Sequence, residues 1–292
     1  MGDSDRLVNY LDPAVRIERT LGRGGDGTVY LARSRDDHSL YVLKVFTHPV
    51  PFDQADGLIL YASSVGANEF GLAHITLIED RSHILALKYR HSPLRPVHYL
   101  CFAAWDHVAQ CLFGAYCRMQ HYLISRHEIA LTDTDVRQFL LAPDGRFHYI
   151  DYSGDIESIH HPWSLERGQF GYALCLLLAS TYHRHLKVLI RPTPGYSYTR
   201  PCSYSMHGEL TALAERHAWV AKVVREVRNN NASALLDADF YLRLCEGMPE
   251  RVRFPSVVNA TSRLLFRLGH VRAGLTRLRG STKQINAKDQ PQ

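Results

Sequence analysis

Hydrophobic residues in the first third of the chain fall into short runs typical of β-strands. Residues 28–32 and 40–46 are two such runs, and a polar stretch over 33–39 separates them. This alternation predicts a β-hairpin. Two further apolar runs, Ile75–Ile78 and Ile84–Arg90, predict two more strands.

Later apolar residues recur instead at spacings of three or four, which is typical of amphipathic helices. Three helices are predicted, over residues 99–124, 169–186 and 262–280. The first carries its apolar stripe on Leu100, Ala104, Val108, Leu112, Ala115 and Met119.

A glycine motif precedes the predicted hairpin. Gly22, Gly24, Gly27 and Val29 form the pattern G-x-G-x-x-G-x-V, which lets a backbone approach phosphates closely. A dinucleotide-binding fingerprint shares the first six positions but opens into a helix. A strand follows here, so we expect a hairpin over a phosphate.

Lys44 lies in the second strand of this hairpin, between apolar neighbours. A lysine in such surroundings is costly unless it has a partner. We therefore expect Lys44 to meet an anionic group.

A second group of polar residues begins after the first predicted helix. Asp133 is followed five positions later by Gln138, then by a predicted strand, Phe139–Leu141. Asp144-Gly145 is a tight-turn signal, and a second strand leads into Asp151.

In this order and spacing, the glycine motif, Lys44, Asp133, Gln138 and Asp151 resemble the ATP site of the protein kinase superfamily. The resemblance implies a two-lobed α+β fold, with an antiparallel β-sheet and one helix in the N-lobe and mainly helices in the C-lobe. ATP with Mg²⁺ or Mn²⁺ would bind between the lobes. It implies that Lys44 holds the α and β phosphates and that Asp133 acts on the acceptor hydroxyl. Asp151 and Gln138 would hold the metal.

The motifs depart from the usual kinase residues at several positions. Leu131-Thr132-Asp133 replaces His-Arg-Asp, Gln138 replaces Asn, and Asp151-Tyr152-Ser153 replaces Asp-Phe-Gly. A glutamine oxygen still suits Mg²⁺, which asks for oxygen ligands. The stretch Asp133-x-x-x-Arg137-Gln138-Phe139 resembles the catalytic loop of the vertebrate lonesome kinase group of secretory-pathway kinases.

Two residues of this stretch bear on the acceptor. Arg137 stands where many tyrosine kinases have arginine, and Asp135 replaces the lysine typical of serine/threonine kinases. Both residues favour tyrosine as the acceptor of the phosphoryl group.

The resemblance also implies a helix carboxylate that pairs with Lys44. The candidates are Asp53, Asp56 and Glu69. We prefer Glu69 for its longer reach, while its closeness to the next strand favours Asp56. The backbone of Lys88, Tyr89 and Arg90 would bind adenine at the hinge between the lobes.

These assignments divide the chain into an extension (1–17), an N-lobe (18–90), a mainly helical C-lobe (91–280) and a disordered tail (281–292). The six cysteines show no C-x-x-C pair, and we interpret them as mostly buried thiols. Histidines are scattered and do not form a zinc motif.

Charge and termini bear on partners and location. The N-terminus is polar and acidic, without a signal-peptide pattern, and no apolar stretch is long enough to span a bilayer. We expect a cytoplasmic protein; the lonesome-kinase resemblance and the sequons at Asn231 and Asn259 favour the secretory pathway if the chain is a mature fragment.

The net charge of +5 is concentrated late, so the basic helix 262–280 packs on the C-lobe or binds an acidic partner or membrane surface. No nucleic-acid partner is expected.

Three functions fit these observations. The first is a protein kinase that transfers the γ-phosphate of ATP to a protein hydroxyl. The second is a kinase for a small molecule or sugar, and the third is a pseudokinase scaffold, favoured by Gln138 and the altered Asp-Phe-Gly. Retention of Lys44, Asp133 and Asp151 together favours catalysis.

Overall fold

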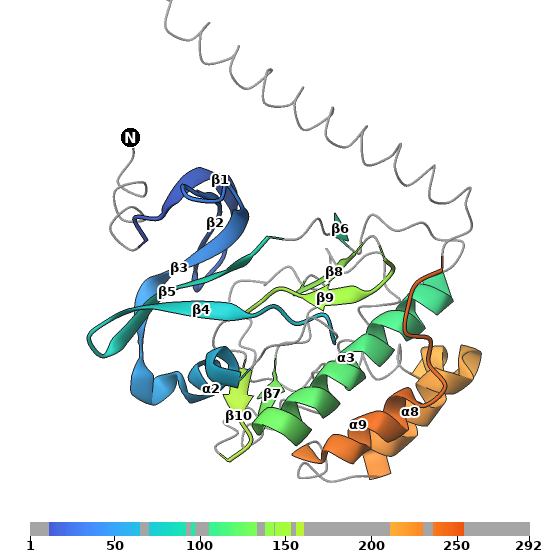
Figure 1. Ribbon diagram of the computed structural model, residues 1–292. Coiled ribbons are helices and arrows are strands. Elements are labelled where there is room, and N and C mark those ends of the chain that lie inside the picture. The colour runs from blue at the N-terminus through green and yellow to red at the C-terminus, as the bar shows by residue number, and fades with distance from the viewer. Residues whose placement is uncertain are drawn as a thin grey trace, which may run out of the picture.

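A five-stranded antiparallel sheet and a group of helices make up most of the described part of the chain, so the fold is α+β (Figure 1). The computed structural model describes residues 12–64, 70–91, 95–96, 105–132, 138–142, 144–152, 156–160, 211–229 and 236–253.

The sheet has the strand order β1-β2-β3-β5-β4. Its strands are β1 (Val15–Arg23), β2 (Gly27–Ser34), β3 (Leu40–Pro51), β4 (Ile75–Asp80) and β5 (His83–Arg90). The expected hairpin is β2 and β3, and the two further runs are β4 and β5. The strand β1 begins three residues before the expected lobe boundary at residue 18, because Val15 is buried in the sheet's own apolar cluster.

The pairing register assigns side chains to the two faces of the sheet. Val29, Lys44 and Leu87 lie opposite one another on β2, β3 and β5, and Tyr30, Leu43 and Lys88 form the next row. Because successive side chains of a strand alternate, these rows lie on opposite faces. We call the face with Lys44 the inner face and the face with Lys88 the outer face. The outer face carries a small apolar cluster: Val15, Tyr30, Ala32, Leu43, Val45 and Ala86.

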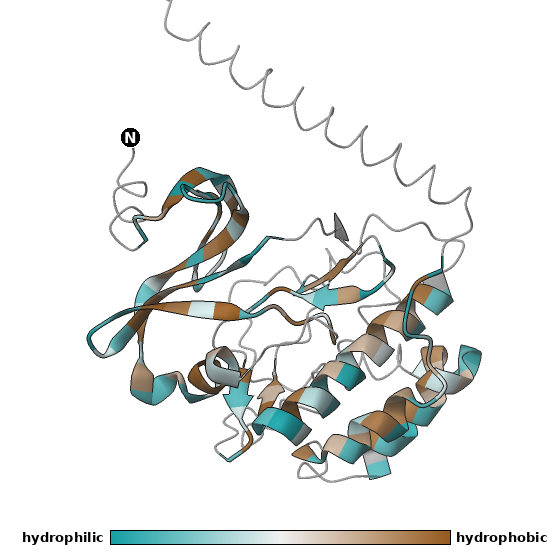
Figure 2. Cartoon of the chain, in the orientation of Figure 1, coloured by the Kyte–Doolittle hydropathy of each residue, from teal (hydrophilic) through white to brown (hydrophobic). Residues whose placement is uncertain are grey.

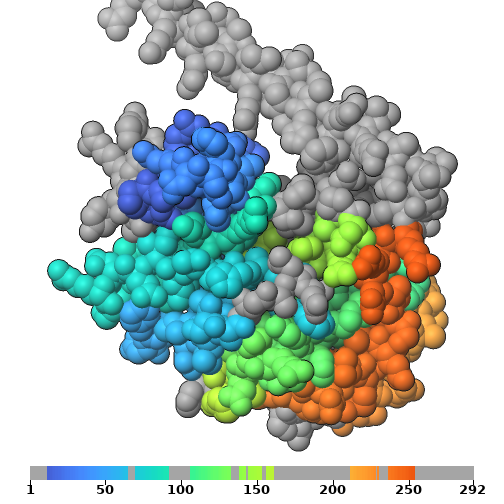
Figure 3. All heavy atoms as spheres, viewed as in Figure 1, coloured from blue at the N-terminus to red at the C-terminus, as the bar shows by residue number. Residues whose placement is uncertain are grey.

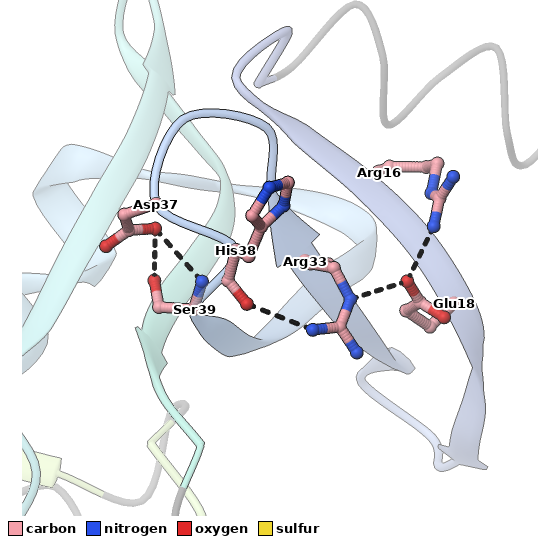
Figure 4. A network of polar contacts seen from close by, with 6 residues as sticks. All are labelled: Arg16, Glu18, Arg33, Asp37, His38 and Ser39. Atoms are coloured by element: carbon pink, nitrogen blue, oxygen red, sulfur yellow. Dashed lines mark hydrogen bonds and ion pairs between the residues drawn. The ribbon is translucent and has the colours of Figure 1, made fainter.

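Polar contacts join the edge strand β1 to the β2–β3 turn (Figure 4). Arg33 on β2 donates to Glu18 Oε1 on β1 at 2.9 Å and to the carbonyl of His38 in the turn at 3.0 Å. The hydrogen bonds from Arg16 and Arg33 lower the pKa of Glu18. Since exposed ion pairs add little stability, the network mainly defines the geometry of the turn.

A short helix follows β3 and packs against a two-stranded ribbon. The helix α2 (Asp56–Ser64) comes after the 3₁₀ turn η1 (Phe52–Gln54), and β10 (Ile156–Ser158) pairs antiparallel with β7 (Ile129–Leu131). A Cβ atom on Gly57 would lie only 2.2 Å from the carbonyl oxygen of Ile156. Glycine therefore permits the close approach of α2 to β10.

The remaining described elements surround the long helix α3 (Trp105–His127), which extends beyond the predicted end at Ile124. They are α8 (Ala218–Asn229), α9 (Ala238–Cys245), and the small sheet β6-β8-β9, formed by Arg95–Pro96, Phe139–Leu141 and Phe147–Tyr149. Hydrophobic positions along α3 and α9 alternate with hydrophilic ones (Figure 2). In the space-filling view the sheet, in blue to cyan, lies on one side of the green segment and the orange segment lies on the other (Figure 3).

Several sequence expectations fall on residues that the structure does not describe: the helices 169–186 and 262–280, the tail 281–292 and both sequons. Among the described cysteines, Cys111, Cys117 and Cys245 are buried free thiols, as expected. Within the same part of the chain, no helix combines the length and apolar character needed to cross a membrane.

Replacing Gly57 with alanine tests the packing of α2 on β10. The added methyl group would overlap backbone atoms of Ile156 and Glu157, so we expect a loss of about 1–3 kcal/mol of unfolding free energy. Urea denaturation measures it. Gly25→Ala is the matched control, because a Cβ there meets no atom within 4 Å; equal stability of the two variants would contradict the tight contact.

Candidate functional site

An ion pair joins the inner face of the sheet to the segment after β9. Lys44 Nζ on β3 donates to Asp151 Oδ1 at 2.6 Å, across 107 residues of sequence. The two side chains are only 10% and 17% exposed. A second carboxylate, Asp26 Oδ2 in the glycine loop, lies 4.0 Å from the same Nζ. Lys44 thus has the anionic partners that its apolar neighbours require.

The β8–β9 hairpin brings Gln138 beside Asp151. Phe139 pairs with Tyr149, and the N–H of Ile150 donates to the carbonyl of Gln138 at 2.9 Å. Gln138 and Asp151 therefore leave the open end of the hairpin together, and Gln138 Nε2 donates to Asp151 Oδ2 at 2.8 Å.

The closed end of the same hairpin contains the predicted Asp144-Gly145 turn. Gly145 has a φ of 84°, a backbone conformation that favours glycine. A Cβ there would also lie 2.5 Å from the carbonyl oxygen of Val252. The N–H of Val252 donates to the carbonyl of Gly145 at 2.8 Å. The turn is thus fixed against the segment after α9.

Tyr152 fixes the backbone next to Asp151. Its hydroxyl donates to the carbonyl of Tyr149 at 2.7 Å and accepts the N–H of Ala73 at 2.7 Å. The ring lies 5.2 Å from that of Tyr61 on α2 and 5.3 Å from that of Tyr89 on β5. Burial raises the pKa of Tyr152 to about 12, so at neutral pH the hydroxyl stays protonated and keeps its donor role.

The loop before β4 ties the sheet to the hairpin. The carbonyl of Gly71 accepts the N–H of Tyr149 at 3.0 Å. Gly71 has a φ of 77°, and a Cβ there would lie 2.1 Å from the carbonyl oxygen of Phe147. Tyr89 adds a weaker contact by donating to the carbonyl of Ile150 at 3.4 Å.

A buried glutamine fixes the strand that leads to Asp133. Gln120 on α3 donates to the carbonyl of Leu131 at 2.7 Å, and its Oε1 accepts the N–H of Leu131 at 2.9 Å. Gln120 is fully buried. Both backbone groups of Leu131, two positions before Asp133, are therefore held by one side chain. Asp133 itself lies outside the described residues.

The three motif glycines differ in what their surroundings require. At Gly27 a Cβ would lie 2.2 Å from the carbonyl oxygen of Val45, so the β2–β3 contact itself demands glycine. At Gly22 and Gly24 a Cβ would meet no atom within 4 Å. Contacts among the described residues therefore give no reason for glycine at these two positions. Val29 lies beside Lys44 on the inner face.

The structure bears on which acid pairs with Lys44. The ion pairs of Lys44 among the described residues join it to Asp151 and Asp26. By contrast, Asp53 in the turn η1 and Asp56 at the start of α2 are exposed. Glu69, the preferred partner, lies outside the described residues.

The structure also bears on the assignment of Lys88, Tyr89 and Arg90 to an adenine-binding hinge. Lys88 and Tyr89 pair with β3 on one side and β4 on the other, so their backbone groups already serve the sheet. Binding of adenine by the backbone of Lys88 and Tyr89 does not fit this pairing. Arg90 is paired with Tyr41 on β3, and the described β4 register ends one residue earlier, at Tyr89.

Comparisons with known proteins do not assign a family. No protein-family model matches the chain, and no curated protein matches it in sequence. Within the described ranges, His, Cys, Asp and Glu side chains do not gather in threes at a metal-binding distance. The arrangement at Asp151 pairs one carboxylate with one amide instead.

Sequence reasoning missed three residues of this site. Asp26 was part of the glycine motif but carried no assigned role, and Tyr152 was noted only as a departure. Gln120 gave a signal of its own, since it falls at helical spacing between apolar residues of α3, four after Tyr116 and four before Ile124. A polar residue in that position commonly satisfies a buried backbone group.

Replacing Tyr152 with phenylalanine tests its positioning role. The ring cluster remains, but the N–H of Ala73 and the carbonyl of Tyr149 lose their partner, so we expect a loss of about 1–3 kcal/mol of unfolding free energy. Chemical denaturation measures the change. Tyr122→Phe, at a half-buried tyrosine whose ring stacks on Phe70, is the control; the same effect in both variants would argue against a specific role for the Tyr152 hydroxyl.

Proposed function

We propose that the chain is an ATP-dependent phosphotransferase with a two-lobed, protein-kinase-like arrangement, acting on a protein hydroxyl. The observation that carries the proposal is the meeting of three polar residues from two distant segments, Lys44 on the sheet and Gln138 and Asp151 at the open end of the hairpin. The order of these residues in the sequence resembles the kinase motifs.

The energetics of the ion pair support a functional role. Removing a lysine and an aspartate from water costs several kcal/mol per ion, and their attraction often does no more than offset it. An apolar pair at these positions would serve the fold as well. Lys44 and Asp151 are therefore better explained by what they bind than by stability.

The inner face offers a place for a nucleotide beside Lys44. Val29, Leu31 and Val42 share this face by register and provide an apolar surface suited to a base. Lys44 would donate to oxygens of the α and β phosphates. These hydrogen bonds would replace part of its contact with Asp151. The backbone at Gly22 and Gly24, where side-chain space is open, would approach the phosphates.

The residues next to Lys44 suit a hard divalent cation. Asp151 offers carboxylate oxygens and Gln138 an amide oxygen, the ligand types that Mg²⁺ and Mn²⁺ prefer. These two side chains would hold the metal, and a bound Mg²⁺ would neutralise charge on the phosphates. Tyr152 and the β8–β9 pairing fix the backbone beside both residues.

Asp133 would orient the acceptor hydroxyl and receive its proton. Gln120 and the β7–β10 pairing fix the backbone two residues before it, which supports a positioned base. Arg137 and Asp135 favour tyrosine as the acceptor residue on a protein substrate.

A scaffold without catalysis is the second candidate. Lys44 and Gln138 each donate to one oxygen of Asp151, so these contacts hold the cluster together without a ligand. Catalysis requires that the nucleotide compete with this internal contact. A scaffold has no such requirement.

A thermal-shift measurement tests nucleotide binding. At ATP·Mg²⁺ about 100 times above Kd, binding stabilises the native state by about 2.7 kcal/mol, so the wild type should melt higher with the nucleotide. Lys44→Ala should lose most of that shift. Lys88→Ala is the matched control, because Lys88 makes an ion pair of the same length, 2.6 Å to Asp12, on the outer face; it should keep the shift. Equal shifts in both variants would remove Lys44 from the site.

Transfer of labelled γ-phosphate tests the hypothesis that the chain is an active phosphotransferase. With Mg²⁺ or Mn²⁺ and a mixture of proteins and peptides, Asp133→Asn should reduce transfer roughly 10²-fold or more, on the scale of positioned acid–base groups. ATP affinity should stay nearly constant. Gln138→Asn should retain transfer and Asp151→Ala should abolish it. ATP binding without transfer to any acceptor would favour the scaffold.

A further inference from the structure

Helix α9 packs along helix α3, and contacts at both ends of the packed stretch define how the two helices run (Figure 1). His121 Nδ1 on α3 lies 3.2 Å from the carbonyl oxygen of Ala238, the first residue of α9. Gly114, earlier on α3, faces the residue Met248 beyond the end of α9, since a Cβ on Gly114 would lie 3.1 Å from the Cβ of Met248. The two helices are therefore antiparallel where they pack.

Two cysteines lie between these contacts, Cys117 on α3 and Cys245 at the end of α9. Both are free thiols, and both are buried. The thiol of Cys117 donates a hydrogen bond to the sulfur of Cys245. The two sulfurs therefore face each other across the helix pair, which is the arrangement that a disulfide requires.

The two thiols differ in acidity. The hydrogen bond from Cys117 lowers the pKa of Cys245 to about 7, and the positive charges of Arg118 and Lys222 act in the same direction. Burial raises the pKa of Cys117 well above its ordinary value. A large fraction of Cys245 is therefore thiolate at neutral pH, and the thiolate is the form that attacks an oxidant.

We propose that Cys245 and Cys117 form an oxidation site, at which hydrogen peroxide or another two-electron oxidant produces a reversible disulfide between α9 and α3. Cys245 meets the oxidant first, because it is 6% exposed whereas Cys117 has no exposed surface. The residues after Cys245, Glu246 and Gly247, are exposed as well. No residue of the proposed nucleotide site takes part.

The oxidation proceeds in two steps. The Cys245 thiolate attacks one oxygen of hydrogen peroxide, so the O–O bond breaks, hydroxide leaves, and a sulfenic acid remains on Cys245. The hydroxide takes up the proton that Cys245 had lost. The sulfur of Cys117 then attacks the Cys245 sulfur, the S–S bond forms as the S–O bond breaks, and the Cys117 proton leaves with the oxygen as water. Two thiols are thus oxidised to one disulfide, and one peroxide is reduced to two waters.

Mass spectrometry of the full chain, treated with hydrogen peroxide and digested under non-reducing conditions, tests this site. We expect a cross-linked peptide that joins Cys117 to Cys245 and disappears with dithiothreitol. Oxidation of Cys245 should be roughly tenfold or more faster than that of Cys111. Cys111 is the matched comparison, because it is a buried thiol of the same helix α3 and burial raises its pKa to about 11.

Two variants separate the roles of the thiols. Cys117→Ser retains a hydroxyl donor toward Cys245 but forms no disulfide, so dimedone, which reacts with sulfenic acids, should label Cys245 after peroxide treatment. In Cys245→Ser, dimedone should leave Cys117 unlabelled. Cys111→Ser should still form the disulfide. Circular dichroism checks that each variant is folded, and the wild-type mapping needs no variant.

Three results would overturn the site. The first is the absence of the Cys117–Cys245 peptide from folded, peroxide-treated wild type. The second is a disulfide from either residue to a different cysteine in its place. The third is dimedone labelling of Cys117 in Cys245→Ser without labelling of Cys245 in Cys117→Ser, since Cys117 would then be the thiol that attacks the oxidant.

Discussion

The contact between Lys44 and Asp151 joins the five-stranded sheet to the β8–β9 hairpin, and the candidate site depends on it. Lys44 lies in the middle of the sheet and Asp151 follows the last strand of a separate hairpin. An almost buried lysine tolerates no large displacement of its counter-ion. The 2.6 Å contact therefore fixes the position of the sheet relative to the hairpin at this point.

Several independent contacts provide that position. Gly71 and Ala73 join the loop before β4 to Tyr149 and Tyr152, and Gly57 brings α2 against β10. Gln120 fixes Leu131 from the opposite side, on α3. Hydrogen bonds and close backbone contacts thus fix the segments that carry the polar cluster, which is what a preorganised binding site needs.

Local signals in the sequence predicted much of this fold. The runs around the polar turn at 33–39 became β2 and β3, and Asp144-Gly145 became the β8–β9 turn. The hairpin also accounts for the approach of Gln138 to Asp151, since both leave its open end. Such features depend on a few neighbouring residues, and alternation and turn chemistry reveal them.

Contacts between distant segments could not be predicted in the same way. The 4.0 Å approach of Asp26 to Lys44 depends on a backbone contact between Gly27 and Val45. The pairing of Lys88 and Tyr89 with two neighbours depends on β5 lying inside the sheet. Periodicity shows that a strand exists, but its neighbours are set by tertiary packing.

A crystal structure of the chain with Mn²⁺ and a non-hydrolysable ATP analogue tests the central claim most directly. An anomalous peak for Mn²⁺ next to oxygens of Asp151 and Gln138, with phosphate oxygens within hydrogen-bond distance of Lys44 Nζ, is the predicted result. Nucleotide bound elsewhere, or an unchanged 2.6 Å contact between Lys44 and Asp151 with no metal beside it, would contradict the account.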